Sequence, residues 1–293
     1  MDRFEVSVGA SRSVMVRDTG DGQGVPLVYF HGTPGSRLEV GFGDEIARDM
    51  GIRVISFDRP GYGRSAASAT DLGSVARDVE IVLDSLGVGN FAAFGWSGGG
   101  PFALAAAAAM GDRVNRVGVS GGPAPVQQMP GAREALTEND LRALSFLPGD
   151  PVKAAEQFLV GNRQLLDAMM SVKDDEMAPW IDWIWGESDP DVVARPAMRQ
   201  ALHASFQEAL RQGPMAIAWD NVAFVGPWGF DVHDVSSPVH LWYGSRDLMT
   251  PPVAGEWLAA ELPDAELILC EGEGHLLPMS HWAEMLGIVT ADR

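Results

Sequence analysis

The sequence predicts an α/β fold, with a mostly parallel sheet flanked by helices, and three features of its 293 residues carry that prediction. Short apolar runs alternate with longer amphipathic or alanine-rich stretches from residue 25 to 125. The alternation stops at the Gly-Gly-Pro-Ala-Pro segment 121–125, and residues 126–230 then show only helical patterns. It resumes at Val239. Strands that alternate with helices are joined by right-handed crossovers and therefore form a parallel sheet.

The interruption divides the chain into two parts. We expect residues 1–125 and 231–293 to form one α/β core and residues 126–230 to form an inserted helical lid. Apolar runs bounded by Gly, Pro or Asp predict core strands at 27–30, 54–57, 91–94, 114–120, 239–243 and 266–270. Period-two alternation at 4–8 and 14–17 predicts an antiparallel hairpin at the sheet edge. The intervening core helices are expected near 38–50, 74–86, 99–110 and 252–262 and from about 280.

Composition excludes several classes of function. A net charge of −19 repels phosphate backbones and anionic lipid, so neither a nucleic acid nor a membrane is expected as a partner. The longest apolar run, 102–110, is far shorter than the roughly 18 residues that a membrane span needs, and the N-terminus lacks a secretory pattern. A cytoplasmic location is the default expectation. The single cysteine, Cys270, excludes an internal disulfide, and no Cys/His cluster has the spacing of a zinc site.

Two serines lie in a Gly-x-Ser-x-Gly pattern, which is typical of the strand-to-helix elbow that presents a nucleophilic hydroxyl. Around Ser97, an apolar strand precedes the motif and the alanine-rich helix 99–110 follows it. Ser120 also follows a strand, but the prolines at 123 and 125 forbid a helix start there. The sequence therefore favours Ser97 as the nucleophile, with Ser120 as a strand-end residue.

Of six histidines, His275 is the best candidate for the general base, because it lies in a glycine-flexed loop after the last strand. Asp247 follows the strand 239–243, and the order Ser97, Asp247, His275 is that of an elbow-type triad. A carboxylate there would orient the imidazole and stabilise the imidazolium. Asp231 and Asp234 are weaker alternatives, because they precede the same strand and so lie at its opposite end.

The oxyanion of a tetrahedral intermediate needs backbone N–H donors. One candidate is Gly98, at the N-terminus of the helix after the nucleophile. A second is Thr33, which follows the strand 27–30, since the neighbouring Pro34 has no N–H.

Five motifs together resemble the α/β-hydrolase superfamily over essentially the whole chain outside the lid. They are HGTPGSR at 31–37, DRPGYGRS at 58–65, GWSGGG at 95–100, GSRD at 244–247 and GEGH at 272–275. The resemblance implies an eight-stranded sheet and a cofactor-free acyl-transfer mechanism. It also implies that the segment 58–65 is a structural loop without a chemical role.

A serine at the elbow excludes the family's dehalogenases and epoxide hydrolases, which use an aspartate there. We expect a serine hydrolase that cleaves a carboxylic ester of a small to medium, largely hydrophobic small-molecule substrate. A carbon–carbon bond hydrolase for vinylogous diketones, a lactonase, an amidase and an iminopeptidase remain alternatives on the same triad, and a non-catalytic ligand-binding protein is the alternative from another class. Assembly into a homo-oligomer stays open. Substrate contacts are expected from four tryptophans, Trp96, Trp180, Trp183 and Trp185.

Overall fold

A computed structural model describes residues 3–171 and 179–291 and contains one eight-stranded sheet. The strands are β1 Arg3–Ser7, β2 Ser13–Gly20, β3 Val25–Phe30, β4 Ile52–Phe57, β5 Phe91–Trp96, β6 Val114–Ser120, β7 Val239–Gly244 and β8 Ala265–Cys270. Their order across the sheet is β1-β2-β4-β3-β5-β6-β7-β8. Every pairing from β4 to β8 is parallel, whereas β1 pairs with β2 and β2 with β4 in the antiparallel sense. The predicted fold class, including the edge hairpin, is confirmed.

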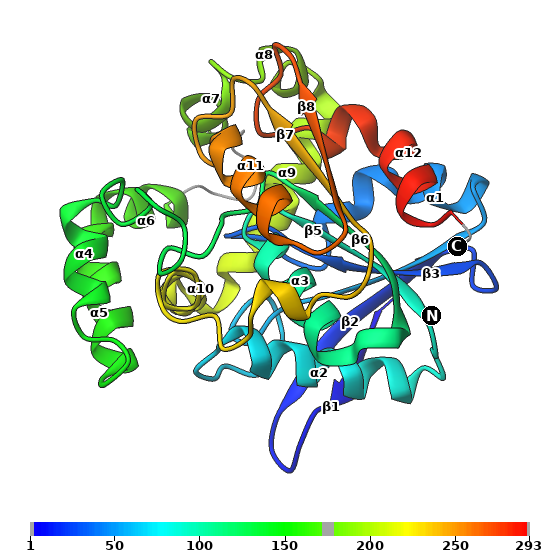
Figure 1. Ribbon diagram of the computed structural model, residues 1–293, viewed down its shortest axis with the longest axis horizontal. Coiled ribbons are helices and arrows are strands. Elements are labelled where there is room, and N and C mark those ends of the chain that lie inside the picture. The colour runs from blue at the N-terminus through cyan, green and yellow to red at the C-terminus, as the bar shows by residue number, and fades with distance from the viewer. Residues whose placement is uncertain (1–2, 172–178, 292–293) are drawn as a thin grey trace.

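Five core helices cover the two faces of the sheet (Figure 1). They are α1 Asp44–Asp49, α2 Leu72–Ser85, α3 Gly99–Met110, α11 Pro252–Glu261 and α12 Pro278–Val289. Helices α2, α3 and α11 pack on one face, and α1 and α12 pack on the other. The helix expected over 38–50 is shorter than predicted: a 3₁₀ turn occupies Glu39–Gly43 and α1 begins only at Asp44. Glycines at 41 and 43 disfavour an α-helical start in this turn.

The two cores follow from the alternation of side chains along each strand. In β3, Val28 and Phe30 belong to the core under α2 and α3, while Leu27 and Tyr29 belong to the core under α12. Helix α3 is apolar on nearly all sides because it is buried between the sheet and α2. Burial of both faces explains why the central strands read as continuous apolar runs.

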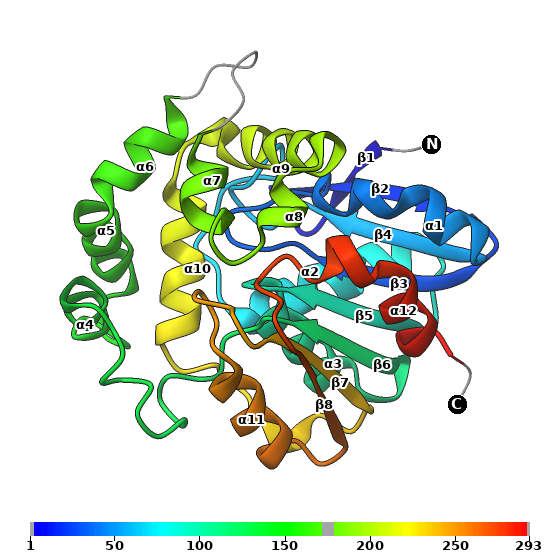
Figure 2. The same ribbon diagram turned by 90° about the horizontal axis from the view of Figure 1, so that it is seen from above.

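Between β6 and β7 the described residues form helices and no strand. We call these the lid helices: α4 Glu138–Leu144, α5 Pro151–Gly161, α6 Arg163–Met170, α7 Trp180–Trp185, α8 Pro190–Val193, α9 Pro196–Ala209 and α10 Met215–Val225. Figure 2 shows them gathered beside the carboxyl ends of the parallel strands. The boundaries at 126 and 230 stay a prediction. None of the helices in the described parts of the chain is long and apolar enough to span a membrane.

Candidate active site

Ser97 lies in a tight elbow between β5 and α3. Its φ of +52° is the only positive value at a non-glycine residue in the described chain. A left-handed conformation is costly for a residue with a Cβ and is typical of functional turns. The Ser97 N–H donates to the carbonyl of Ser120 at 2.7 Å, which fixes the turn against β6. A Cβ added at Gly98 would come within 2.3 Å of the Thr33 hydroxyl oxygen, so a larger residue after the serine would require the Thr33 side chain to move.

Ser120 has a different environment. Its side chain is completely buried, and its hydroxyl has no hydrogen-bond partner among the described residues. The next helix after it begins only at Glu138. The second Gly-x-Ser-x-Gly match therefore forms no elbow, and Ser120 contributes its carbonyl to the turn at Ser97.

Asp247 and His275 meet at the carboxyl ends of β7 and β8. The Asp247 Oδ2 lies 2.7 Å from Nδ1 of His275, and both side chains are almost fully buried. The other carboxylate oxygen accepts from the N–H groups of Met249 at 2.8 Å and Thr250 at 3.0 Å. Burial opposes ionisation of Asp247, but the hydrogen bond and charge of His275 and these N–H groups outweigh it and hold its pKa below the usual value. Asp247 is therefore an anion at neutral pH, and its carboxylate fixes Nδ1 of His275 as a ring nitrogen that carries a proton.

The histidine loop lies against the same strand end as the nucleophile. The ring of His275 borders Gly121, the residue after Ser120, and a Cβ there would come within 3.1 Å of the imidazole. The indole N–H of Trp96, the residue before the nucleophile, donates to the His275 carbonyl at 2.9 Å. The predicted nucleophile, base and acid are thus gathered at one edge of the sheet.

Thr33 and Gly98 lie side by side at the same edge. Both line the cavity that also contains Ser97. The N–H of Gly32 is engaged, because it donates to the buried Glu39 carboxyl group at 2.7 Å. Thr33 follows it in the loop and is held by its hydroxyl, which donates to Asp220 of α10 at 2.6 Å. This arrangement suits two backbone N–H donors for an oxyanion.

The loop that carries Thr33 is fastened to the lid by Arg59. Its guanidinium donates to the carbonyls of His31 and Gly32, and it forms an ion pair with Asp220 at 2.6 Å in which both side chains are buried. Burial and the nearby Arg59 charge hold the pKa of His31 well below its usual value, so this ring is neutral and structural. Sequence reasoning missed Asp220; the signal was a carboxylate in the middle of the largely apolar helix α10.

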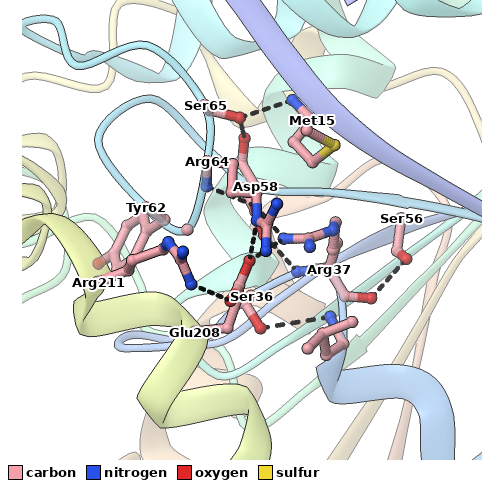
Figure 3. Close-up of polar contacts among 12 residues, drawn as sticks. Met15, Ser36, Arg37, Ser56, Asp58, Tyr62, Arg64, Ser65, Glu208 and Arg211 are labelled. Atoms are coloured by element: carbon pink, nitrogen blue, oxygen red, sulfur yellow. Dashed lines mark hydrogen bonds and ion pairs between the residues drawn. The ribbon is translucent and has the colours of Figure 1, made fainter. Parts of the chain in front are cut away.

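A second buried arginine makes a parallel connection (Figure 3). Arg37 ends the same loop and donates to Asp58 at 2.5 Å and to Glu208 of α9 at 2.8 Å. Asp58 also accepts from the N–H of Arg64 at 3.1 Å. The segment 58–65 therefore connects the loop 31–37 to the lid, while its expected lack of a chemical role stays a prediction.

The other acidic and histidine residues described below do not contact the His275–Asp247 pair. Asp231 is exposed and bonded to His233 before β7, and Asp234 lies beside it in the same turn. His281 is bonded to Glu273. No group of three or more metal-ligating side chains occurs among residues 3–171 and 179–291.

A cavity of about 250 Å³ adjoins Ser97. Its lining is almost entirely apolar and comes mostly from the lid helices, with three polar side chains besides Ser97. Its lining residues are Thr33, Pro34, Ser97, Gly98, Pro123, Phe158, Asn162, Leu165, Leu166, Met169, Ile184, Ile217, Asn221, Phe224 and Met249. None of these described lining residues is charged.

The four predicted tryptophans are not among these lining residues. Trp96 is buried and bonded to the His275 carbonyl. Trp180 and Trp185 are buried in the lid, where both pack on Phe206. Trp183 is 70% exposed. The lid residues that line the cavity beside Ser97 are two phenylalanines, Phe158 and Phe224, together with smaller aliphatic side chains, methionine and two asparagines.

Comparisons with known proteins agree with this architecture. The sequence profile described as "alpha/beta hydrolase fold" matches residues 25–281. A 2-hydroxy-6-oxononadienedioate/2-hydroxy-6-oxononatrienedioate hydrolase from Burkholderia vietnamiensis is 26% identical over 94% of this chain and 89% of its own. A pimeloyl-[acyl-carrier protein] methyl ester esterase from Nitrosomonas europaea is 26% identical over 90% and 92%. The crystal structure of a bromoperoxidase from Bacillus anthracis superposes with a TM-score of 0.73 at 19% identity, covering 99% of this chain and all of the other.

The profile match covers most of the chain, and it agrees with the eight-stranded sheet, the serine elbow and the buried His–Asp pair described above. The chain belongs to the α/β-hydrolase fold family.

Proposed function

We propose that this hydrolase is a serine esterase that cleaves an uncharged, largely hydrophobic carboxylic ester of small to medium size. The observation that carries the proposal is the uncharged cavity beside Ser97. A charged substrate group in an apolar site costs several kcal/mol unless an opposite charge compensates it. The cavity volume of about 250 Å³ suits a short acyl or aryl group.

In the proposed mechanism Ser97 attacks the ester carbonyl while Nε2 of His275 takes the hydroxyl proton. The Asp247 carboxylate stabilises the imidazolium that forms. The N–H groups of Thr33 and Gly98 donate to the oxyanion, and collapse of the intermediate releases the alcohol with a proton from His275. Water activated by the same imidazole then hydrolyses the acyl-enzyme and returns Ser97 to its starting state.

The same cavity disfavours the main alternatives. The Burkholderia relative is named for a dioate substrate, which carries two carboxylates, and such a substrate calls for Arg or Lys in the pocket. An iminopeptidase binds a cationic amine, which calls for a carboxylate. The described lining residues include neither kind of side chain. A vinylogous diketone without carboxylates is the variant of carbon–carbon hydrolysis that the cavity would still accept.

The test is intact-protein mass after exposure to a fluorophosphonate, for the native chain, Ser97→Ala and Ser120→Ala. We expect one adduct on the native chain and on Ser120→Ala, and none on Ser97→Ala. Turnover of a p-nitrophenyl ester series against a neutral dienone diketone then separates the two bond types. A folded native chain that forms no adduct would argue for a non-catalytic binding protein.

A further inference from the structure

A lid residue holds the backbone of the proposed general base. Asp189, which immediately precedes α8, directs its carboxylate at the histidine loop. Its Oδ2 accepts from the N–H of His275 at 2.9 Å, and its Oδ1 accepts from the N–H of Leu276 at 3.0 Å. Asp189 is 6% exposed, so these two hydrogen bonds are shielded from water. A carboxylate that accepts from backbone N–H groups forms stronger hydrogen bonds than a neutral acceptor.

The peptide groups on both sides of the His275 Cα are thereby fixed. The N–H is bound by Asp189 of the lid, and the carbonyl is bound by the indole of Trp96, next to the nucleophile. The imidazole itself is bound by Asp247. Side chains from three separate parts of the chain, around residues 96, 189 and 247–250, therefore hold the backbone and the ring of His275 and so determine where Nε2 points.

The same lid segment also contacts the elbow. The N–H of Asp189 donates to the carbonyl of Trp185 at 2.8 Å, and the Trp185 ring lies 6.4 Å from the ring of Trp96. Ser188 donates from its hydroxyl to Asp189 Oδ2 at 2.6 Å. The approach is close: a Cβ at Gly274, the residue before His275, would collide with Asp189. Segment 185–189 thus bridges the residues that adjoin the nucleophile and the base.

We propose that Asp189 is a positioning residue for His275. The lid would then have two roles, because it lines the substrate cavity and also holds the general base in the correct orientation. This inference rests on the proposed function, because it assumes that His275 activates Ser97. A displaced imidazole would lose alignment with the serine hydroxyl, and a misplacement of about 1 Å can cost on the order of 10²-fold in rate.

The test compares Asp189→Asn with Asp191→Asn. Asp191 carries the same charge two residues along and is exposed, which makes it a matched control. In Asp189→Asn one oxygen becomes an NH₂ group that cannot accept from a backbone N–H. We expect its rate constant for fluorophosphonate inactivation and its ester kcat to fall by roughly 10- to 100-fold with little change in KM, and Asp191→Asn to behave as native.

Proton NMR supplies a readout that a loss of stability alone would not change. The downfield resonance of the His275 Nδ1 proton, shared with Asp247, is expected to shift or broaden in Asp189→Asn at temperatures where circular dichroism shows a native fold. Gly274→Ala places a methyl group against the Asp189 carboxylate and so pushes Asp189 away from the His275 backbone without changing any charge. This variant tests the positioning role of Asp189 if Asp189→Asn does not fold. A folded Asp189→Asn or Gly274→Ala with native inactivation rate and native resonance would overturn the inference. A native chain that does not react with the fluorophosphonate would instead refute the proposed function.

Discussion

Asp220 is expected to be one of the most sensitive positions in the lid. Its Oδ2 accepts from Arg59 at 2.6 Å, from the Tyr62 hydroxyl at 2.7 Å and from the Thr33 hydroxyl at 2.6 Å. The side chains of Arg59 and Asp220 are 0% and 1% exposed. Asp220→Asn keeps the shape and one carbonyl acceptor, but it leaves the guanidinium of Arg59 without a counter-charge in the interior.

The expected cost can be estimated from the burial of the pair. Removing one partner of a buried ion pair costs about 3–5 kcal/mol, because the remaining charge is left uncompensated. The matched control is Asp182→Asn, which breaks the pair with Arg199 on the lid surface, where Asp182 is 54% exposed. Exposed pairs contribute only about 0–1 kcal/mol, so the control should lose little stability.

The assay is urea unfolding followed by tryptophan fluorescence and by circular dichroism, with the free energy of unfolding extrapolated to water. Arg59→Met/Asp220→Asn removes both charges and should recover part of the loss, which would identify the unpaired charge as its cause. A loss for Asp220→Asn below about 1 kcal/mol, or equal to that of Asp182→Asn, would refute the reasoning.

Three further predictions concern pH, specificity and catalysis. Burial raises the pKa of Glu39 to about 8, so between pH 4.5 and 8 the folded chain holds a proton that the unfolded chain releases, and the free energy of unfolding should decline as pH rises through this range. In urea unfolding at a series of pH values, Glu39→Gln should flatten that decline. The control Glu45→Gln, at an exposed residue, should leave the decline unchanged. Phe224→Ala enlarges the cavity and should shift kcat/KM about tenfold towards bulkier acyl groups in a p-nitrophenyl ester series, whereas Val160→Ala on the lid surface should not. Asp247→Asn should lower kcat by on the order of 10³- to 10⁴-fold with a native circular dichroism spectrum, and native turnover would rule out Asp247 as the orienting acid.

The sequence alone determined the fold class and the residues of the proposed triad, because both depend on local signals. Apolar runs bounded by Gly and Pro mark the strands, and each strand end then brings its loop to one edge of a parallel sheet. Ser97 could be separated from Ser120 by the prolines that follow the second motif. Those rules act over a few residues and do not need the tertiary structure.

Only the tertiary structure decided how the lid takes part. Asp189, Glu208 and Asp220 lie in helical patterns that carry no motif, yet each bonds to a loop of the proposed active site. The lid tryptophans show the opposite case: they were predicted to contact the substrate, but none of them lines the cavity beside Ser97. Packing buries Trp180 and Trp185 in the lid and leaves Trp183 exposed. Helical periodicity identifies an apolar face but not its partner, because partners far apart in sequence are chosen by packing and by the need of every buried charge for a counter-charge.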